Sequence, residues 1–166
     1  PSPKVNVLGI DNFEAGRLAA TTLIARGYKQ IGFMGGPKSA TSTEDRFSGF
    51  KAEISKHADV SLTSSFASAY SFDAGRAQML SLLQNTAAEA YFCGDDVLSI
   101  GALSAIESAN LDVPKDIGLL GLNDMEMAGW ENINLTTIHN PIKQIVESSV
   151  ELVERMLKDD QPAPEA

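Results

Sequence analysis

Apolar residues form two alternating patterns along this chain. Short β-prone runs, typical of buried strands, occupy Val5–Ile10, Ile31–Met34, Leu62–Phe66, Ala90–Cys93 and Ile117–Leu122, with a short extended piece at Leu135–Ile138. Between them, apolar positions recur with a helical period and predict helices over Ala15–Arg26, Ser42–His57, Phe72–Leu83, Val97–Ala109 and Pro141–Leu157. This repeated strand–helix order predicts an α/β fold with a doubly wound, mostly parallel sheet. In such sheets, ligands bind beyond the carboxyl ends of the strands, at the point where the strand order reverses.

Turn and cap residues support these boundaries. Gly27 is placed to end the first helix. Ser42, followed by Asp45 three residues later, is close to a capping box and predicts the start of the second helix. Pro114 prevents a helix from continuing, and Pro141 opens the last one. The polar, proline-rich tail 159–166 is expected to be flexible.

The charge and the single cysteine exclude several classes of function. The chain has 166 residues, with 13 basic against 22 acidic residues and a net charge of -9. We therefore expect these residues to bind neither nucleic acid nor an anionic membrane directly. Cys93 lies in an apolar run, where a buried thiol is typical, and one cysteine suits a reducing compartment. The first residues lack the features of a secretory signal, so we expect a cytoplasmic location.

A glycine-rich turn, "FMGGPKSATSTEDR", joins the second strand to the second helix. It has neither the G-K-[ST] ending of a Walker A loop nor the G-x-G-x-x-G spacing, so a nucleotide site is disfavoured. Ser42 and Arg46 are expected to project from the helix start toward the carboxyl edge of the sheet. The guanidinium of Arg46 would suit a carboxylate or vicinal hydroxyls, although a surface role for Arg46 fits the sequence equally well.

Polar pairs end two of the predicted strands, Asp95-Asp96 and Asn123-Asp124. Paired carboxylates favour Mg²⁺ or a phosphoryl acceptor, but phosphoacceptor domains also need a Lys at a later strand end, and Lys115 precedes its strand. A receiver-like or Mg²⁺-dependent enzyme at Asp95 and Asp96 therefore stays a lesser alternative. One of the two carboxylates is expected to cap the following helix, which leaves the other to face a ligand.

Catalytic and metal motifs receive no support from the sequence. His57 and His139 lie far apart without Cys or His neighbours at ligand spacing, and no G-x-S-x-G elbow is present. We predict no enzyme activity, no metal and no cofactor. Tyr70 and Trp130 stand in polar, loop-like surroundings, where an aromatic ring can stack on a sugar or simply pack in the loop.

Four blocks carry a resemblance to a known family: "GIDNFEAGRLAATTLIARGYKQIGFMGGP", "DRFSGFKA", "YFCGDDVLSIGALSAIESANLDVPKDIGLLGLNDMEMA" and "LTTIHNP". Together, from Val5 to Leu157, they resemble the effector-binding core of the lactose-repressor/galactose-repressor (LacI/GalR) family of bacterial transcription regulators. The resemblance implies a two-lobed core like a periplasmic sugar-binding protein, with the effector between the lobes and a homodimer. It also implies that operator DNA is bound only through an N-terminal headpiece that this chain lacks.

The resemblance further implies lobe boundaries and contact residues. Residues 1–28 would be part of an N-terminal lobe, 29–135 the C-terminal lobe, 136–158 a crossover with an N-terminal-lobe helix, and 159–166 a flexible tail. The apolar faces of the N-terminal-lobe helices would need cover from another segment or a second copy. The implied effector contacts are Ser42, Arg46, Tyr70, Asp95, Asn123 and Glu14.

This chain departs from the family pattern at both polar pairs. Many members have Asn-Asp or Ser-Asp at Asp95-Asp96, and Asp-Asp or Asp-Asn at Asn123-Asp124. One carboxylate and one amide are thus exchanged between the two positions, so a sugar specificity does not transfer directly. Asp96 and Asp124 are expected to be structural, capping the helix or fixing the loop.

We therefore predict a non-enzymatic domain that senses a small-molecule effector, a carbohydrate or a related metabolite, within a LacI-type repressor. A free periplasmic-type sugar-binding protein is the alternative, because it shares the fold.

Overall fold

The computed structural model describes residues 8–85 and 87–158. The chain divides into two compact units. Residues 12–139 lie in the larger unit, and the described residues 8–11 and 140–158 lie in the other. The larger unit carries the sheet, whereas helix α5 (Ile142–Lys158) belongs to the other unit.

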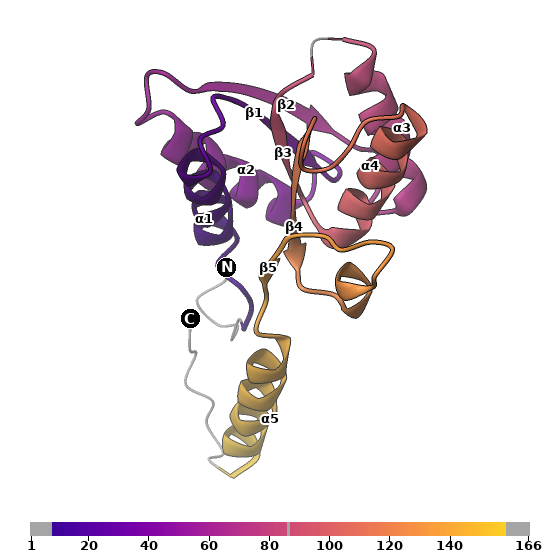
Figure 1. Cartoon of the computed structure of the whole chain (residues 1–166). Helices are drawn as coiled ribbons and strands as arrows, with labels where there is room; N and C mark the ends of the chain where they lie inside the picture. The colour runs from indigo at the N-terminus through magenta and orange to yellow at the C-terminus, as the bar shows by residue number, and fades with distance from the viewer. Residues whose placement is uncertain (1–7, 86, 159–166) are drawn as a thin grey trace. The chain divides into compact units, whose positions relative to one another are not determined.

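Five parallel strands form the sheet in the order β2-β1-β3-β4-β5 (Figure 1). Their bounds are β1 Gln30–Gly35, β2 Ser61–Phe66, β3 Ala90–Cys93, β4 Gly118–Asn123 and β5 Thr137–His139. The prediction of a doubly wound α/β sheet is therefore confirmed. Because β2 and β3 lie on opposite sides of β1, the strand order reverses between β1 and β3, and this pair is the topological switch point.

Helices pack in two pairs against the sheet. Their bounds are α1 Asn12–Ala25, α2 Thr41–Ile54, α3 Phe72–Leu83 and α4 Asp96–Ser108, and a short 3₁₀ helix, η1, spans Glu126–Gly129. Figure 1 shows α1 and α2 on one side of the sheet and α3 and α4 on the other. Glycines allow close approach within each pair. A Cβ at Gly16 would lie 2.0 Å from the Arg46 carbonyl oxygen, and one at Gly75 would lie 2.4 Å from that of Leu98.

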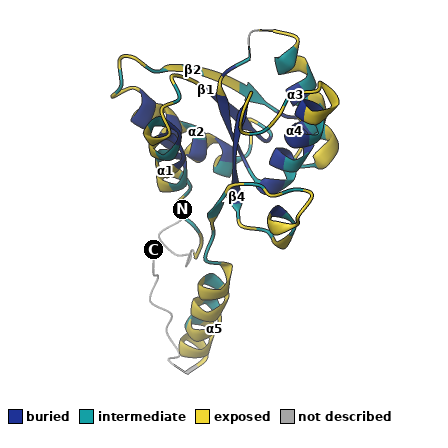
Figure 2. Ribbon diagram, in the orientation of Figure 1, coloured by how far each residue is buried: buried dark blue, intermediate teal, exposed yellow. Residues whose placement is uncertain are grey.

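The two faces of the sheet bury different side chains. Under α2, Phe33 packs against a ring of other phenylalanines with centroid separations of 5.0 to 5.9 Å, namely Phe47, Phe50, Phe66 and Phe92. Beside α3 and α4 the core is mainly aliphatic and includes Met34, Met79, Leu98, Leu103, Ile106 and Leu119. Alternation along a strand explains the division, since Phe33 and Met34 point to opposite faces. Every residue of β3 is buried, and in β1 only Gln30 is exposed (Figure 2).

Most predicted elements are confirmed within a residue or two, but two local expectations are wrong. Gly27 takes the left-handed conformation that its predicted cap role needs, with φ 93°. Helix α2, however, begins at Thr41 after Ala40, and no side chain caps it, so Ser42 is not its N-cap. Residues 8–10 are not in a strand, and residues 5–7 of the expected first strand lie outside the described part of the chain, as does the tail 159–166.

The predicted lobe boundaries at residues 28 and 136 stay a prediction. In the structure, α1 packs on α2 within the larger unit. Helix α5 has an exposed apolar face, as expected for a helix whose apolar side would be covered by another segment or a second copy. Its exposed side chains include Ile142, Val146, Val150, Val153 and Leu157. Among the described residues, no helix has the length and apolar character needed to cross a membrane.

Candidate functional site

Segments far apart in sequence meet at the carboxyl ends of β1 and β3. A Cβ at Gly36, just after β1, would lie 2.4 Å from Cζ of Tyr70, which follows β2. A Cβ at Gly94, just after β3, would lie 3.2 Å from the Gly36 amide nitrogen. The two glycines therefore let the turns and the tyrosine ring close on one another. This is the edge of the sheet, at the switch point, where α/β folds bind ligands.

Arg46 brings a buried cation to this edge. Its side chain extends from α2 and the residue is only 8% exposed. Nε donates a hydrogen bond of 2.8 Å to Asn12 Oδ1, and Nη1 donates one of 2.6 Å to the Gly94 carbonyl. Burial lowers the pKa of Arg46, opposed by Tyr70 and Asp95, but an arginine stays protonated. Neutral acceptors thus hold a positive charge at the strand ends.

The hydroxyl of Tyr70 is held by a hydrogen bond with Thr43. The two hydroxyl oxygens, Tyr70 Oη and Thr43 Oγ1, lie 2.6 Å apart and share a hydrogen bond. Thr43 is fully buried in α2, one turn before Arg46. The helix that carries the arginine therefore also positions the aromatic ring. We call Asn12, Thr43, Arg46, Tyr70 and Asp95 the switch-point cluster.

Asp95, not Asp96, caps helix α4. Its Oδ1 accepts a hydrogen bond of 2.8 Å from the Leu98 amide. The prediction that one of the two carboxylates caps the helix is confirmed, and the capping residue is Asp95, because the extended backbone belongs to Asp95 and helical geometry begins at Asp96. The expectation that the other carboxylate is left to face a ligand is wrong, because Asp96 is fully buried. Burial raises the pKa of Asp95, while the Leu98 amide and Arg46 oppose the rise. A carboxylate can accept several hydrogen bonds, so capping and ligand contact are compatible.

Asp96 is structural, as expected, but it fixes a turn rather than a helix end. The residue is fully buried. Oδ1 accepts a hydrogen bond of 2.5 Å from the Thr137 hydroxyl in β5, and Oδ2 accepts one of 2.8 Å from the Met125 amide after β4. Burial raises the pKa of Asp96, and these two donors oppose the rise.

Asn123 ends β4 in an unusual backbone conformation. Its φ is 117°, and that of Asp124 is 55°. Positive φ is uncommon for residues other than glycine, so surrounding contacts must hold this turn. Asp124 Oδ2 lies 2.8 Å from His139 Nδ1 in β5, so these two exposed side chains link the turn to β5. We call Asp96, Asn123, Asp124, Met125 and Thr137 the turn cluster.

Ser42 and Glu14 complete the predicted contact residues. Ser42 is half-buried in the first turn of α2. Glu14 lies on the exposed side of α1 in an ion pair with Arg17, at 2.5 Å between Oε1 and Nη2. Their parts in ligand binding stay a prediction. The contacts therefore bring Arg46, Tyr70 and Asp95 into one cluster, and Asn123 ends the strand next to β3.

Sequence reasoning missed two residues of the switch-point cluster. Asn12 lies 34 positions before Arg46, and nothing in a single sequence pairs them. Thr43 stands one position from the candidate Ser42, and only the register of α2 decides which of them points inward. Knowing that the helix begins at Thr41 would have favoured Thr43.

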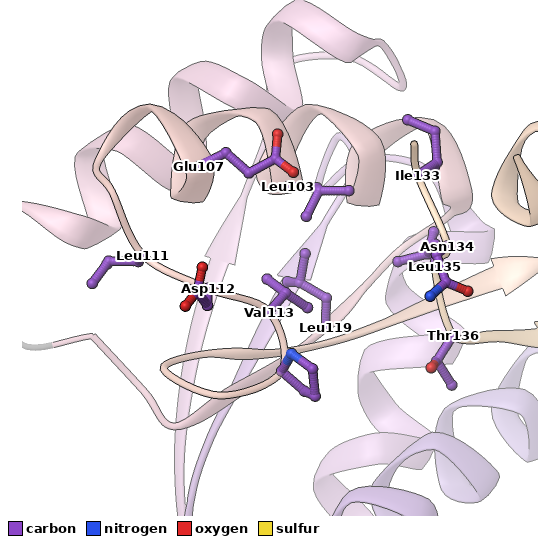
Figure 3. A pocket seen from close by; sticks show the side chains of 11 residues that line it. Leu103, Glu107, Leu111, Asp112, Val113, Leu119, Ile133, Asn134, Leu135 and Thr136 are labelled. Atoms are coloured by element: carbon purple, nitrogen blue, oxygen red, sulfur yellow. The ribbon is translucent and has the colours of Figure 1, made fainter. Parts of the chain in front are cut away.

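The cavity drawn in Figure 3 lies elsewhere. It has a volume of about 330 Å³ and is lined by Leu103, Glu107, Leu111, Asp112, Val113, Pro114, Leu119, Ile133, Asn134, Leu135 and Thr136. In Figure 3, Leu103 lies on the side of its helix that faces Val113 and Leu119. Since Leu119 is the second residue of β4 and Thr136 directly precedes β5, the cavity is at the amino ends of these strands. None of the predicted contact residues lines it. Within the described ranges, no group of three His, Cys, Asp or Glu side chains is arranged to hold a metal.

Comparison with known proteins identifies the fold family. Residues 20–166 match the model of the periplasmic binding protein-like domain, so the chain belongs to this family. Its curated relatives include the HTH-type transcriptional repressor PurR of Klebsiella pneumoniae, 32% identical over 148 residues. That match covers 87% of this chain and 43% of the relative, so the chain spans about half the length of the curated relatives it matches.

Solved structures agree. A LacI transcriptional regulator from a Rhodococcus species superposes with a TM-score of 0.88 at 25% identity, covering 95% of this chain and 59% of the other. The resemblance to the core of LacI-type regulators is therefore confirmed. A LacI-family regulator from Enterococcus faecium, solved with bound ribose, has a TM-score of 0.81 at 24% identity and shares the fold. That match covers 91% of this chain and 56% of the other.

Proposed function

We propose that this chain is the effector-sensing part of a LacI-type repressor and that its effector is a carbohydrate or a related polar metabolite bound at the switch-point cluster. One observation carries the proposal. Arg46, Tyr70 and Asp95, from three separate segments, converge beyond β1 and β3, where a doubly wound sheet binds ligands. The complete protein would act in the cytoplasm, without catalysis, as a dimer.

The cluster's chemistry favours a ligand rich in hydroxyl groups. An arginine donates, a carboxylate accepts, and an asparagine at the end of the neighbouring strand can do both. A tyrosine ring adds an apolar surface for the C–H face of a sugar ring, with its polar tip already engaged by Thr43. The ribose named with the Enterococcus faecium regulator shows that this fold can hold a sugar.

Signalling would follow from differential affinity. Residues 12–139 form one compact unit, and at Asn140 the chain passes to the other. An effector that binds one arrangement of the lobes more tightly shifts the population toward it, and operator affinity changes by the same coupling free energy. DNA contact would come from a headpiece outside this chain, since the net charge of -9 disfavours it here.

A ligand panel tests this proposal. Thermal shift followed by calorimetry would screen sugars, including D-ribose, then sugar phosphates and nucleobases, against the complete protein. We expect at least one sugar-like binder, with affinity reduced at least tenfold in Arg46→Ala. Arg76→Ala is the matched control, because Arg76 lies on α3 and its Nη2 donates a hydrogen bond of 3.3 Å to the exposed Ser108 hydroxyl. A panel without binders, or equal affinities in the wild type and Arg46→Ala, would contradict the site.

A further inference from the structure

The turn cluster joins two strands through one buried side chain. The Asp96 carboxyl bonds with the Thr137 hydroxyl in β5 and with the Met125 amide after β4. The two donors lie in separate segments, while Asp96 itself begins α4. The carboxyl group therefore connects the start of a helix, the end of one strand and the neighbouring strand.

The sheet is shaped around this carboxyl group. A Cβ at Gly121, in the middle of β4, would lie only 2.3 Å from Asp96 Oδ1. A glycine at this position is thus what lets the carboxyl group reach between β4 and β5. Asp96 itself has no exposed surface, so it serves as an internal link and cannot touch a ligand in solvent.

The same link holds the turn that carries Asn123. Two consecutive residues, Asn123 and Asp124, have positive φ. The Asp124 amide donates to Thr137 Oγ1 at 3.3 Å, and the amide of the next residue, Met125, donates to Asp96. Both amides are therefore satisfied through the Asp96–Thr137 pair, which keeps the disfavoured backbone in place.

We propose that Asp96 is a positioning residue that couples β5 to the turn bearing Asn123, so that a movement of β5 changes where Asn123 lies. The meaning of this coupling for an effector rests on the proposed function, because Asn123 is one of its expected contacts. β5 ends at His139, directly before the chain enters the other unit. A link at this position transmits between the ligand edge and the segment that leads out of the larger unit.

Hydrogen exchange of the whole chain, without any ligand, tests the coupling. Thr137→Val keeps the shape of the side chain but removes its hydroxyl. We expect the Asp124 amide, which donates to the removed hydroxyl, to exchange about tenfold faster, since one lost hydrogen bond lowers local protection by roughly that factor. The Met125 amide should also exchange faster, because its acceptor Asp96 is no longer held by Thr137. The amide of Phe33 in β1 should not change. Thr136→Val is the matched control, because Thr136 is exposed and precedes the strand.

Equal exchange at Asp124 and Met125 in Thr137→Val and Thr136→Val would overturn the proposal. If Thr137→Val does not fold, Asp96→Asn replaces one acceptor oxygen by a donor at nearly constant volume. Faster exchange at Asp124 or Met125 is then expected, and wild-type exchange at both would overturn the proposal as well. Because no ligand is used, this failure would leave the sensing function standing, whereas a ligand panel without binders would remove the function and leave the coupling.

Discussion

The switch-point cluster and the turn cluster lie at the ends of neighbouring strands, at the same edge of one sheet. The first contains a buried cation, whereas the second contains a buried carboxyl group. In the first, the Arg46 cation is held by neutral acceptors and lies beside partly buried Asp95. In the second, the Asp96 carboxyl is fully buried and receives two neutral donors. In the switch-point cluster, Arg46 and Asp95 offer polar groups that a ligand can bind. In the turn cluster, the Asp96 carboxyl is used to hold the Met125 amide and the Thr137 hydroxyl.

Truncation in the turn cluster should therefore have the largest effect on folding. Asp96→Ala leaves the Thr137 hydroxyl and the Met125 amide without their acceptor, so we expect the free energy of unfolding to fall by about 2–4 kcal/mol. Urea denaturation measures this fall. Asp59→Ala is the control, because Asp59 is exposed and pairs only at the surface with Lys29. If Asp96→Ala loses no more free energy of unfolding than Asp59→Ala does, the Asp96 carboxyl does not stabilise the turn as described.

A methyl group at Gly36 should displace the Tyr70 ring of the switch-point cluster. The added Cβ would lie 2.4 to 2.7 Å from three atoms of the Tyr70 ring, so the ring must move away from Thr43. We expect Gly36→Ala to lower the free energy of unfolding by about 1–3 kcal/mol, the usual cost of overpacking. Gly129→Ala has no atom within 4 Å of its new Cβ and serves as the control. Equal melting temperatures for the two variants would mean that the ring is not fixed.

The third prediction separates binding from stability. Arg46→Ala should weaken effector binding at least tenfold, or about 1.4 kcal/mol, because it removes the charged donor. It should also destabilise the fold less than Asp96→Ala, since Arg46 is 8% exposed and one of its two acceptors, Asn12 Oδ1, is only partly buried, whereas Asp96 has no exposed surface. Calorimetry and urea denaturation on the same samples give both values. An Arg46→Ala protein that loses as much stability as Asp96→Ala but binds the effector normally would contradict this prediction.

The smallest expected effect concerns pH. Burial raises the folded-state pKa of Asp95 above the unfolded value of about 3.9. The folded state then binds the proton more tightly, so this contribution to stability is fully present below pH 4 and is lost as pH rises through the folded-state pKa.

Asp95→Asn keeps a capping side chain without the titration. Wild type should lose stability relative to Asp95→Asn between pH 3 and 7, by roughly 1.4 kcal/mol for each unit of difference between the two pKa values. Urea denaturation of both proteins across this range measures the difference. A wild type that gains on the variant as pH rises would mean that Leu98 and Arg46 outweigh burial.

The sequence predicts the elements well and the fine placement of side chains poorly. Hydrophobic periods give α3 (Phe72–Leu83) and β3 (Ala90–Cys93) to the residue, because burial on one or both faces constrains every position. The roles of Asp95 and Asp96 could not be assigned, because they are chemically identical neighbours. A single residue's backbone conformation decides which one caps α4 and which one turns inward.

Contacts between separate elements account for the part of the site that the sequence did not predict. Arg46, Tyr70 and Asp95 could be grouped because each follows a strand, and parallel strands end at one edge. Asn12 could not be grouped with them, since it reaches Arg46 from α1 through packing that no local pattern encodes. The φ of 117° at Asn123 likewise depends on its surroundings, as asparagine does not require it.

Chemical-shift mapping of the backbone amides during titration with the tightest binder of the panel shows at which end of the sheet the effector binds. We expect the largest changes at Gly36 and Gly94, which border the switch-point cluster, and at Asn123 of the turn cluster, all at the carboxyl edge of the sheet. Changes concentrated instead at Glu107, Asp112 and Asn134, around the cavity at the opposite ends of β4 and β5, would contradict this expectation.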